Sequence, residues 1–495
     1  MLQLEVLVGL SVLIWVLIVW LQKSRENYWK KHGVSYIPGL PLIGCGFTFN
    51  KSIGEFFAQE LYNDPITKNE PFSGFYFFNQ PSLLIRDPEL IKKIMVKDFN
   101  VFMDRIASSD PDVDAIGNSM LPLAKGEKWK KIRTGITPVF TTMRIKNFFT
   151  IVKDISREFE KKLAQETTRG WKEYDVKRLS GFFTVDTIAQ CFFGVKSDSL
   201  SNPQSPFFVN AVAMTKFTWQ RAIMFFSLLF FPGFAKKMKF TFFMSSENTF
   251  LRESITTVMS QREKMGIKCN DLIDILISMK NTQQDIFHGD VLVGQAAAFL
   301  FAGYETSSSA TSFALYLLAK HPDIQARVRR EILEELEKTG DITFEGINDL
   351  QYLNMVIQET LRMYPSLMVL DRVCVDDNSY SLEPQHSFSI PKGMPVYIPT
   401  FAIHRDPNIY QNPEEFDPER FHNISNDLMF LSFGLGPRTC IGGRFAMIQV
   451  KMALISILKS YKVECCANTM SKITFDPRSF LMQSKDPINL IFRKL

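Results

Sequence analysis

The sequence predicts a mainly α-helical protein with small β-sheets, an α+β fold, preceded by one N-terminal transmembrane helix. Helical spacing of apolar residues with charged faces recurs along the chain, whereas strand-like runs are few and short. A long run without charged residues occurs near the N-terminus. Helical segments with small sheets at their edges fit this class better than an alternating α/β fold.

The composition of the 495 residues excludes several classes of protein. Hydrophobic residues make up 46% of the chain, which excludes intrinsic disorder because apolar surface offsets the chain entropy. A mean hydropathy of −0.02 excludes a polytopic membrane protein. The net charge of +5 is too diffuse to indicate nucleic-acid binding. Seven cysteines, an odd and low count, argue against a disulfide-built secreted scaffold.

Residues 1–22 are predicted to be a membrane anchor. Residues 6–21 carry no charge, and as a helix they span roughly 24 Å. Four basic residues follow the run: Lys23, Arg25, Lys30 and Lys31. The positive-inside rule then places the rest of the chain in the cytosol, at the endoplasmic reticulum membrane. A cleaved signal peptide is the alternative, but the sequence lacks its basic start and small-residue cleavage site.

The rest of the chain divides into a linker and a large body. Residues 23–44 are expected to form a basic, Pro/Gly-rich hinge, although a turn-rich linker explains the same pattern. Within 45–495, apolar spacing predicts helices over 272–280, 291–301, 324–338, 350–363 and 445–457. Short runs predict strands at 75–78, 82–85, 396–398 and 488–492.

Residues 433–446 carry the strongest signal for function. Gly434, Gly436 and Pro437 force a tight loop, so Cys440 lies just before the helix expected at 445–457. Unpaired amide groups and the helix dipole favour a thiolate there. A thiolate is a suitable axial haem ligand, and Arg438 can reach an anionic propionate. The alternative, a small buried hydrophobic cysteine, suits the other six, which have no such loop.

This segment resembles the haem-binding signature of the cytochrome P-450 family, F-x-x-G-x-R-x-C-x-G. Every signature position is filled, by Phe433, Gly436, Arg438, Cys440 and Gly442. The resemblance implies a haem-enclosing cytochrome P-450 fold and a haem-thiolate monooxygenase. Its cofactor would be haem b, and Cys440 would be the metal ligand.

Residues 302–307 resemble the oxygen-activation motif of the family. The resemblance implies that Ala302 lies against the haem and that Glu305 and Thr306 relay protons, because a hydroxyl beside an acid can act as a general acid. Gly303 interrupts an apolar helical run at a cost of roughly 1 kcal/mol relative to Ala, so we expect a close approach to a ligand. A polar kink in a buried helix is the alternative.

Other motifs follow in the family's order. Trp129 and Arg133 match W-x-x-x-R and lie at i and i+4, so the resemblance places them at one haem propionate, and Arg372 at the other. Glu359 and Arg362 match E-x-x-R, and with Arg420 they are expected to form a structural network. The motifs must meet at one cofactor, so residues 45–495 are predicted to form one catalytic domain.

Substrate and membrane contacts are predicted from apolar segments. Residues 221–234 are largely apolar and precede Lys236, Lys237 and Lys239. This pattern indicates a second contact with the membrane, through which lipophilic substrates could enter the protein. A pair of core helices is the alternative. By resemblance, the pocket is lined by Ile116, Ala302, Val369 and Met482. Residues 302–316 and 370–374 are most similar to insect-type, xenobiotic-metabolising members.

No flavin or nicotinamide motif is visible, so electrons must come from a partner. The resemblance implies an NADPH-dependent flavoprotein reductase and allows cytochrome b5. A basic docking face is expected at Lys125, Lys128, Lys130, Lys131 and Arg444, although a solvated charged surface explains these residues equally well. A haem-thiolate isomerase or dehydratase and a non-catalytic haem or lipid carrier remain alternatives, against which the Glu305–Thr306 pair argues.

Overall fold

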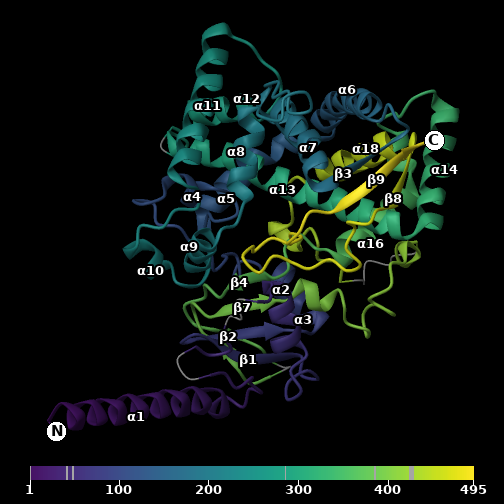
Figure 1. The fold of residues 1–495 in the computed structure, drawn as a ribbon. Coiled ribbons are helices and arrows are strands. Elements are labelled where there is room, and N and C mark those ends of the chain that lie inside the picture. Colours follow the sequence, from purple (N-terminus) through teal and green to yellow (C-terminus); the bar gives the residue numbers. More distant parts are fainter. Residues whose placement is uncertain (1, 41–42, 47–49, 285, 384–385, 423–428) are drawn as a thin grey trace. The chain divides into compact units, whose positions relative to one another are not determined.

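A computed structural model describes residues 2–40, 43–46, 50–284, 286–383, 386–422 and 429–495. Within the helix at residues 2–31, the side chains of residues 2–4, 7, 8, 11 and 21 are also outside the described part. The chain forms two compact units, each assembled from separate stretches of sequence (Figure 1). Unit 1 comprises residues 1–106, 367–411 and 434–439, and unit 2 comprises 107–366, 412–433 and 440–495. One catalytic domain over 45–495 stays a prediction.

Unit 1 is built on a four-stranded sheet in the order β1-β2-β7-β4. Its strands are β1 (Phe72–Phe77), β2 (Gln80–Ile85), β7 (Pro395–Ile398) and β4 (Leu370–Val373). The β1–β2 and β4–β7 pairs are antiparallel, and β2 pairs with β7 in parallel. Strands β5 (Tyr380–Ser381) and β6 (Ser389–Ile390) form a hairpin, and the short helices are α2 (Ile53–Phe56), α3 (Pro88–Lys92) and α17 (Thr400–Ile403). Two π-helical segments, η1 (Phe57–Tyr62) and η2 (Lys93–Lys97), continue α2 and α3.

The first helix of unit 1, α1 (Leu2–Lys31), continues well beyond the predicted anchor. Its last turns pack on the sheet: Trp29 is fully buried, and a Cβ on Gly74 of β1 would lie 2.5 Å from its ring. The amide of Ile37 donates to Gly74 O at 2.8 Å. Residues 23–37 of the expected hinge are therefore helical or packed along β1, while Pro41 and Leu42 lie outside the described residues. Among the described residues, no helix is long and apolar enough to cross a membrane.

Unit 2 is mainly helical. Its helices are α4 (Ala115–Ser119), α5 (Gly126–Ile136), α6 (Thr142–Glu166), α7 (Val176–Phe193), α8 (Pro206–Thr215), α9 (Trp219–Phe230), α10 (Pro232–Lys237), α11 (Ser245–Met265), α12 (Leu272–Thr282), α13 (Asp290–Lys320), α14 (Pro322–Thr339), α15 (Gly346–Asp349), α16 (Gln351–Met363) and α18 (Gly443–Leu458). Unit 2 also contains two 3₁₀ turns, η3 (Thr137–Phe140) between α5 and α6, and η4 (Pro418–Phe421). An antiparallel sheet has the order β3-β9-β8, from β3 (Trp171–Asp175), β9 (Asn489–Lys494) and β8 (Tyr461–Cys465).

The helices predicted from apolar spacing are confirmed as α12, α13, α14, α16 and α18, and the four predicted strands as β1, β2, β7 and β9. Phe78, placed in a strand by the sequence, instead follows β1 with a φ of 52°. The mainly helical fold with small sheets is therefore confirmed.

Helix α13 is the central element of unit 2 (Figure 1). It packs against α7, α4, α18, α11 and α16, and most of its side chains are buried. A helix that is apolar on nearly all sides must be surrounded by other elements. Residues on α13 are consequently held in fixed positions by several neighbouring helices.

Candidate functional site

Cys440 lies at the start of α18 in unit 2. Its amide donates to Phe433 O at 2.7 Å, and Gly442 is the N-cap of α18. The residue is exposed, and the unpaired amides and dipole of a helix start favour its thiolate form. The position predicted for Cys440, just before a helix, is confirmed.

Gly436 gives the preceding turn its shape. It begins a 3₁₀ turn in unit 1, η5 (Gly436–Arg438), with a φ of 71°. The amide of Thr439 closes the turn by donating to Gly436 O at 2.9 Å. A Cβ at this position would overlap the backbone oxygen of Met95. Both the left-handed conformation and the close approach require glycine.

Two of the predicted propionate ligands meet in unit 1. Arg372, on β4, is 1% exposed and Arg438 is 6% exposed. The Nε of Arg438 donates to Met103 O at 2.6 Å. The Nη1 of Arg372 donates to Asp371 O at 2.7 Å, whereas its buried Nε has no hydrogen-bond partner among the described residues.

Arg105 is a third cation in this cluster, and sequence reasoning missed it. Burial and the charge of Arg105 lower the pKa of Arg372 to about 10, against the opposing charge of Asp371. Burial and the charges of Arg105 and Arg372 lower the pKa of Arg438 to about 9, against the opposing charges of Asp104 and Asp371. The Nε of Arg105 is also buried without a partner among the described residues. Guanidinium groups gathered in this way match an anion with several oxygens.

A second group of predicted residues meets in unit 2. Trp129 and Arg133 lie one turn apart on α5, the tryptophan 5% exposed and the arginine half-buried. Burial lowers the pKa of Arg133, and the negative charge of Cys440 opposes that shift. The structure therefore brings Arg133 close enough to Cys440 for their charges to interact.

The middle of α13 carries Ala302 and Thr306. Ala302 is exposed and Thr306 is half-buried, although most other residues of this helix are buried. The hydroxyl of Thr306 donates to Ala302 O at 2.8 Å. Residues four apart lie on one helical face, so the face of α13 that carries Ala302 and Thr306 is the less buried face at the middle of the helix.

Gly303 and Glu305 both have close neighbours on α7. A Cβ on Gly303 would lie 2.8 Å from the Cδ1 of Ile188 on α7, so packing against α7 also favours a small residue here, and the ligand approach stays a prediction. Glu305 is 1% exposed and accepts from Lys177 Nζ at 2.6 Å and Ser309 Oγ at 2.9 Å. Its carboxylate therefore makes an ion pair with α7.

A family model described as Cytochrome P450 matches residues 35–492. The chain belongs to the cytochrome P450 family. It is similar to "Probable cytochrome P450 6g2" of Drosophila melanogaster, at 36% identity over 99% of this chain and 98% of the relative. "Probable cytochrome P450 6w1" of the same organism is also 36% identical, over 97% and 96%. "Cytochrome P450 6j1" of Blattella germanica is 35% identical, over 94% and 93%.

The cofactor of this cytochrome P450 is haem b with an axial cysteine thiolate. The described residues fit that group in two respects. Cys440 is an exposed residue at a helix start, and the buried Nε groups of Arg105 and Arg372 lack partners among the described residues that propionate oxygens can supply. Family membership identifies the protein as a haem-thiolate monooxygenase in general terms.

The network predicted for Glu359, Arg362 and Arg420 is confirmed. Glu359 and Arg362 are fully buried and bonded through two contacts, of 2.7 and 2.9 Å. The Nε of Arg420 donates to Glu359 at 3.2 Å, and the amide of Asp417 donates to the same oxygen at 3.0 Å. The carboxylate thus joins α16 to the segment that contains η4, a folding role in the cytochrome P450.

The four residues predicted to line the pocket differ in exposure. Ala302 is exposed, and Val369, in unit 1, is half-buried. Ile116 and Met482 are each 1% exposed, so both are packed inside unit 2. Of the three predicted pocket residues in unit 2, only Ala302 is exposed.

Proposed function

We propose that this cytochrome P450 is a membrane-anchored monooxygenase that oxidises lipophilic small molecules with electrons from a separate NADPH-dependent flavoprotein reductase. When bound, the haem activates O2, so that one oxygen atom enters the substrate and the other leaves as water. The observation that carries the proposal is the position of Cys440, exposed at the start of α18 with Arg133 nearby.

Each site residue has a defined task in this proposal. Cys440 ligates the iron, and the turn at Gly436 and the packing of Phe433 fix the loop that presents it. The propionates are held by basic and aromatic side chains: Trp129, Arg133, Arg372, Arg438 and, as an addition from the structure, Arg105. Ala302 forms the open face of α13 beside the haem, which its exposure supports.

Glu305 and Thr306 supply protons. Thr306 Oγ1 is at the open face of α13, and its bond to Ala302 O leaves the hydroxyl oxygen able to accept a further hydrogen bond. Glu305 immediately precedes Thr306 and is the nearest acid in the sequence. The chain therefore holds an alcohol at the site and an acid behind it, as proton delivery requires.

Membrane attachment is supported by exposed apolar side chains. On α1, Val12, Leu13, Trp15, Leu17 and Trp20 are all more than half exposed, and burying them in lipid removes that area from water. On α9 and α10, Ile223 and Phe234 are 53% and 51% exposed beside exposed Lys236 and Lys237. The rest of residues 221–234 is mixed, because Arg221, Ala222, Phe225 and Leu228 are buried.

The substrate class follows from the same surfaces. A chain with exposed apolar side chains on α1, α9 and α10 can receive compounds that partition into a bilayer. We therefore propose lipophilic xenobiotics or endogenous lipids and hormones as substrates, and the endoplasmic reticulum as the location. The resemblance of residues 302–316 and 370–374 to insect-type, xenobiotic-metabolising members makes xenobiotics the first class to screen.

The docking face for the reductase is smaller than the sequence suggested. Lys130 and Lys131 on α5 and Arg444 on α18 are exposed. Lys128 is half-buried and donates to Asn118 Oδ1 at 3.0 Å, so its charge faces the protein. We assign docking of an acidic reductase, and of cytochrome b5, to the exposed cations at the start of α5 and α18.

Turnover with purified reductase tests this function. The Lys130→Glu/Lys131→Glu variant is expected to lose about tenfold in NADPH-driven product formation at low salt, because like charges slow docking. The matched control is Lys264→Glu/Lys268→Glu, which makes the same charge change at exposed positions at and after the end of α11. Product formation without NADPH or reductase would instead favour an isomerase or dehydratase. Haem or lipid binding without any product would favour a carrier.

A further inference from the structure

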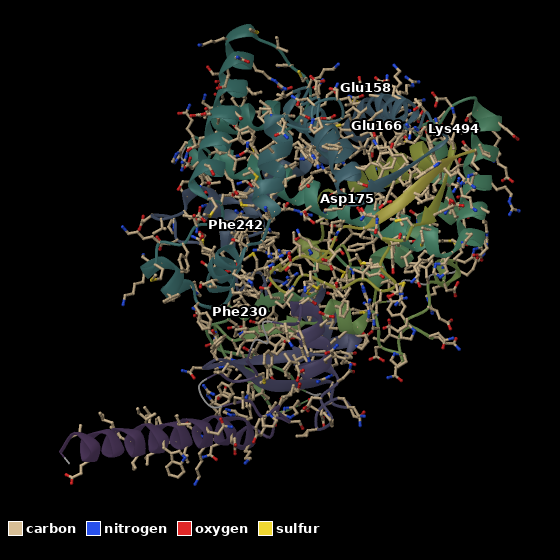
Figure 2. The ribbon with its side chains drawn as sticks, viewed as in Figure 1. Glu158, Glu166, Asp175, Phe230, Phe242 and Lys494 are labelled. Atoms are coloured by element: carbon tan, nitrogen blue, oxygen red, sulfur yellow. The ribbon has the colours of Figure 1, made fainter. Side chains whose placement is uncertain are left out.

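Five phenylalanine rings, each from a different element of unit 2, meet beside the start of α18. Phe242, labelled in Figure 2, belongs to another ring group, with Phe225 and Phe243. The five rings beside α18 are those of Phe140 in η3, Phe148 on α6, Phe192 on α7, Phe299 on α13 and Phe445 on α18. They connect parts of unit 2 that are far apart in the sequence.

Phe192 is the centre of this group and is 3% exposed. Its ring lies edge-on to the other four, with interplanar angles between 60° and 77°. In such a pair the positive ring edge lies against the negative ring face, so the direction of each ring matters. Four contacts of this kind hold Phe192 in one orientation. The centroid distances are 5.8 Å to Phe140, 5.2 Å to Phe148, 5.0 Å to Phe299 and 4.8 Å to Phe445.

Two of the rings lie at the first turn of α18, which follows Cys440. Phe445 is the third residue of this helix, is 4% exposed and packs against Phe192. Gly442 is the N-cap of α18, and a Cβ there would lie 3.6 Å from the ring of Phe140. The ring group therefore holds the helix start from two directions.

Phe299 connects the group to the less buried face of α13. It is half-buried, and it precedes Ala302 by three residues and Thr306 by seven, so the three share one helical face. Its ring stacks on that of Phe140 at 5.6 Å, with an interplanar angle of 18°. The rings therefore join the face that carries Ala302 to the turn that follows Cys440.

Filling the core does not require this arrangement. Phe159 and Phe183 form an ordinary core pair, because they join α6 to α7 at 5.4 Å and both are fully buried. Phe140 and Phe299 are half-buried instead, and they lie beside the two surfaces that the proposed function gives to the haem. Because protein interiors are close-packed, a displacement of one ring is passed to its neighbours.

We propose that Phe192 is a positioning residue that fixes the start of α18, and with it the Cys440 sulfur, relative to the less buried face of α13. This rests on the proposed ligation of the haem iron by Cys440. A ligand must be held within about 0.5 Å of its productive geometry by neighbours whose own orientations are fixed. Phe192 provides this support through Phe445 and Phe140.

Three variants and one control test this proposal on the full-length haem protein. The variants are Phe192→Leu, Phe445→Leu and the double variant. The control is Phe183→Leu, which makes the same change at a fully buried position of the same helix. The reduced, CO-bound protein is kept well below the thermal midpoint of every variant, and the decay of the red-shifted Soret band of a thiolate ligand is followed.

Phe192→Leu and Phe183→Leu should both lower the thermal midpoint, because each shortens a buried side chain and leaves space in the core. Phe192→Leu should also lose the thiolate band about tenfold faster than the wild type, because its edge-to-face contacts are gone. Phe183→Leu should keep the wild-type decay rate. The double variant should decay no faster than the faster single variant, because Phe192→Leu and Phe445→Leu break the same contact.

Amide hydrogen exchange of the haem protein gives a second readout. The amide of Ala446 donates to Gly442 O at 2.9 Å in the first turn of α18. Its exchange should be faster in Phe192→Leu than in the wild type and unchanged in Phe183→Leu. Phe140→Leu changes a half-buried ring and should move both readouts in the same direction by a smaller amount, so the test does not depend on the folding of one variant.

Equal effects of Phe192→Leu and Phe183→Leu on band decay and amide exchange would overturn the proposal, because Phe192 would then act only as a core residue. Decay rates that multiply in the double variant would overturn it as well, since the two rings would then act independently. A wild-type protein without the thiolate band would instead contradict the ligation of iron by Cys440 in the proposed function.

Discussion

A buried lysine, Lys451, makes the stability of this protein depend on pH. Lys451 on α18 is 5% exposed and donates to Ile347 O at 2.9 Å. Burial lowers its pKa from the ordinary 10.5 to about 8, although the charge of Glu331 opposes the shift. The folded state therefore holds the charged lysine less readily than the unfolded chain does.

The sign of the resulting pH dependence can be worked out for Lys451. Below about pH 8 both states are protonated, and the folded state bears the full cost of the buried charge. Between pH 8 and 10.5 only the unfolded state binds the proton, so stability from this group rises by about 1.4 kcal/mol per unit. The difference in thermal midpoint, Lys451→Met minus wild type, should fall steadily over this range. A pH-independent difference would show that Lys451 titrates normally.

Residue identities were partly predictable from the sequence. Cys440 and Arg438 lie in one motif with fixed spacing, Arg372 was assigned by resemblance, and the structure gives each a consistent position. Arg105 lies in no motif; it joins the site because Asp104 bridges to Val373 on β4, far along the chain. Lys177 meets Glu305 across 128 residues. Pairing over such distances depends on the fold, and a single sequence does not show it.

Elements with strong local patterns were predicted well. Apolar periodicity marks α12, α14 and α16, whose ends shift by only one or two residues from the expected ones. Strand β3 was missed because Trp171–Asp175 is short and half exposed, and it is a strand through antiparallel pairing with β9. The ligand approach expected at Gly303 stays a prediction, because a close helix neighbour and a close ligand both favour a small residue.

The turn before Cys440 offers a matched pair of glycine substitutions. Gly434 and Gly436 both have positive φ, of 76° and 71°. A Cβ on Gly434 would lie no nearer than 3.7 Å to a neighbouring atom, whereas one on Gly436 would overlap Met95 O. Gly434→Ala should cost about 1 kcal/mol from the backbone conformation alone, and Gly436→Ala about 1–3 kcal/mol more from the overlap.

Haem content and thermal midpoint of the purified variants measure this difference. Gly436→Ala is expected to lose most of its haem during purification, and Gly434→Ala to retain it. Equal retention by both variants would show that Met95 moves aside and that the close approach is not required.

At the scale of the whole molecule, membrane attachment is predicted to depend on two surfaces. Deleting residues 1–22 removes the exposed apolar part of α1 and leaves Trp29 packed on the sheet. We expect the truncated protein to distribute between membrane and soluble fractions, because Ile223 and Phe234 remain exposed. Adding Ile223→Ser and Phe234→Ser should move it to the soluble fraction. Full-length protein that is soluble after cell lysis would contradict both contacts.

The account as a whole depends on one bond, from the Cys440 sulfur to the haem iron. The most direct test is the absorption spectrum of the reduced, CO-bound protein. The wild type should show the red-shifted Soret band of a thiolate ligand, because electron donation from sulfur alters the haem. Cys440→Ala should lose that shift, while alanine at exposed Cys269 should keep it. A wild-type band without the thiolate shift, or one unchanged in Cys440→Ala, would contradict the account.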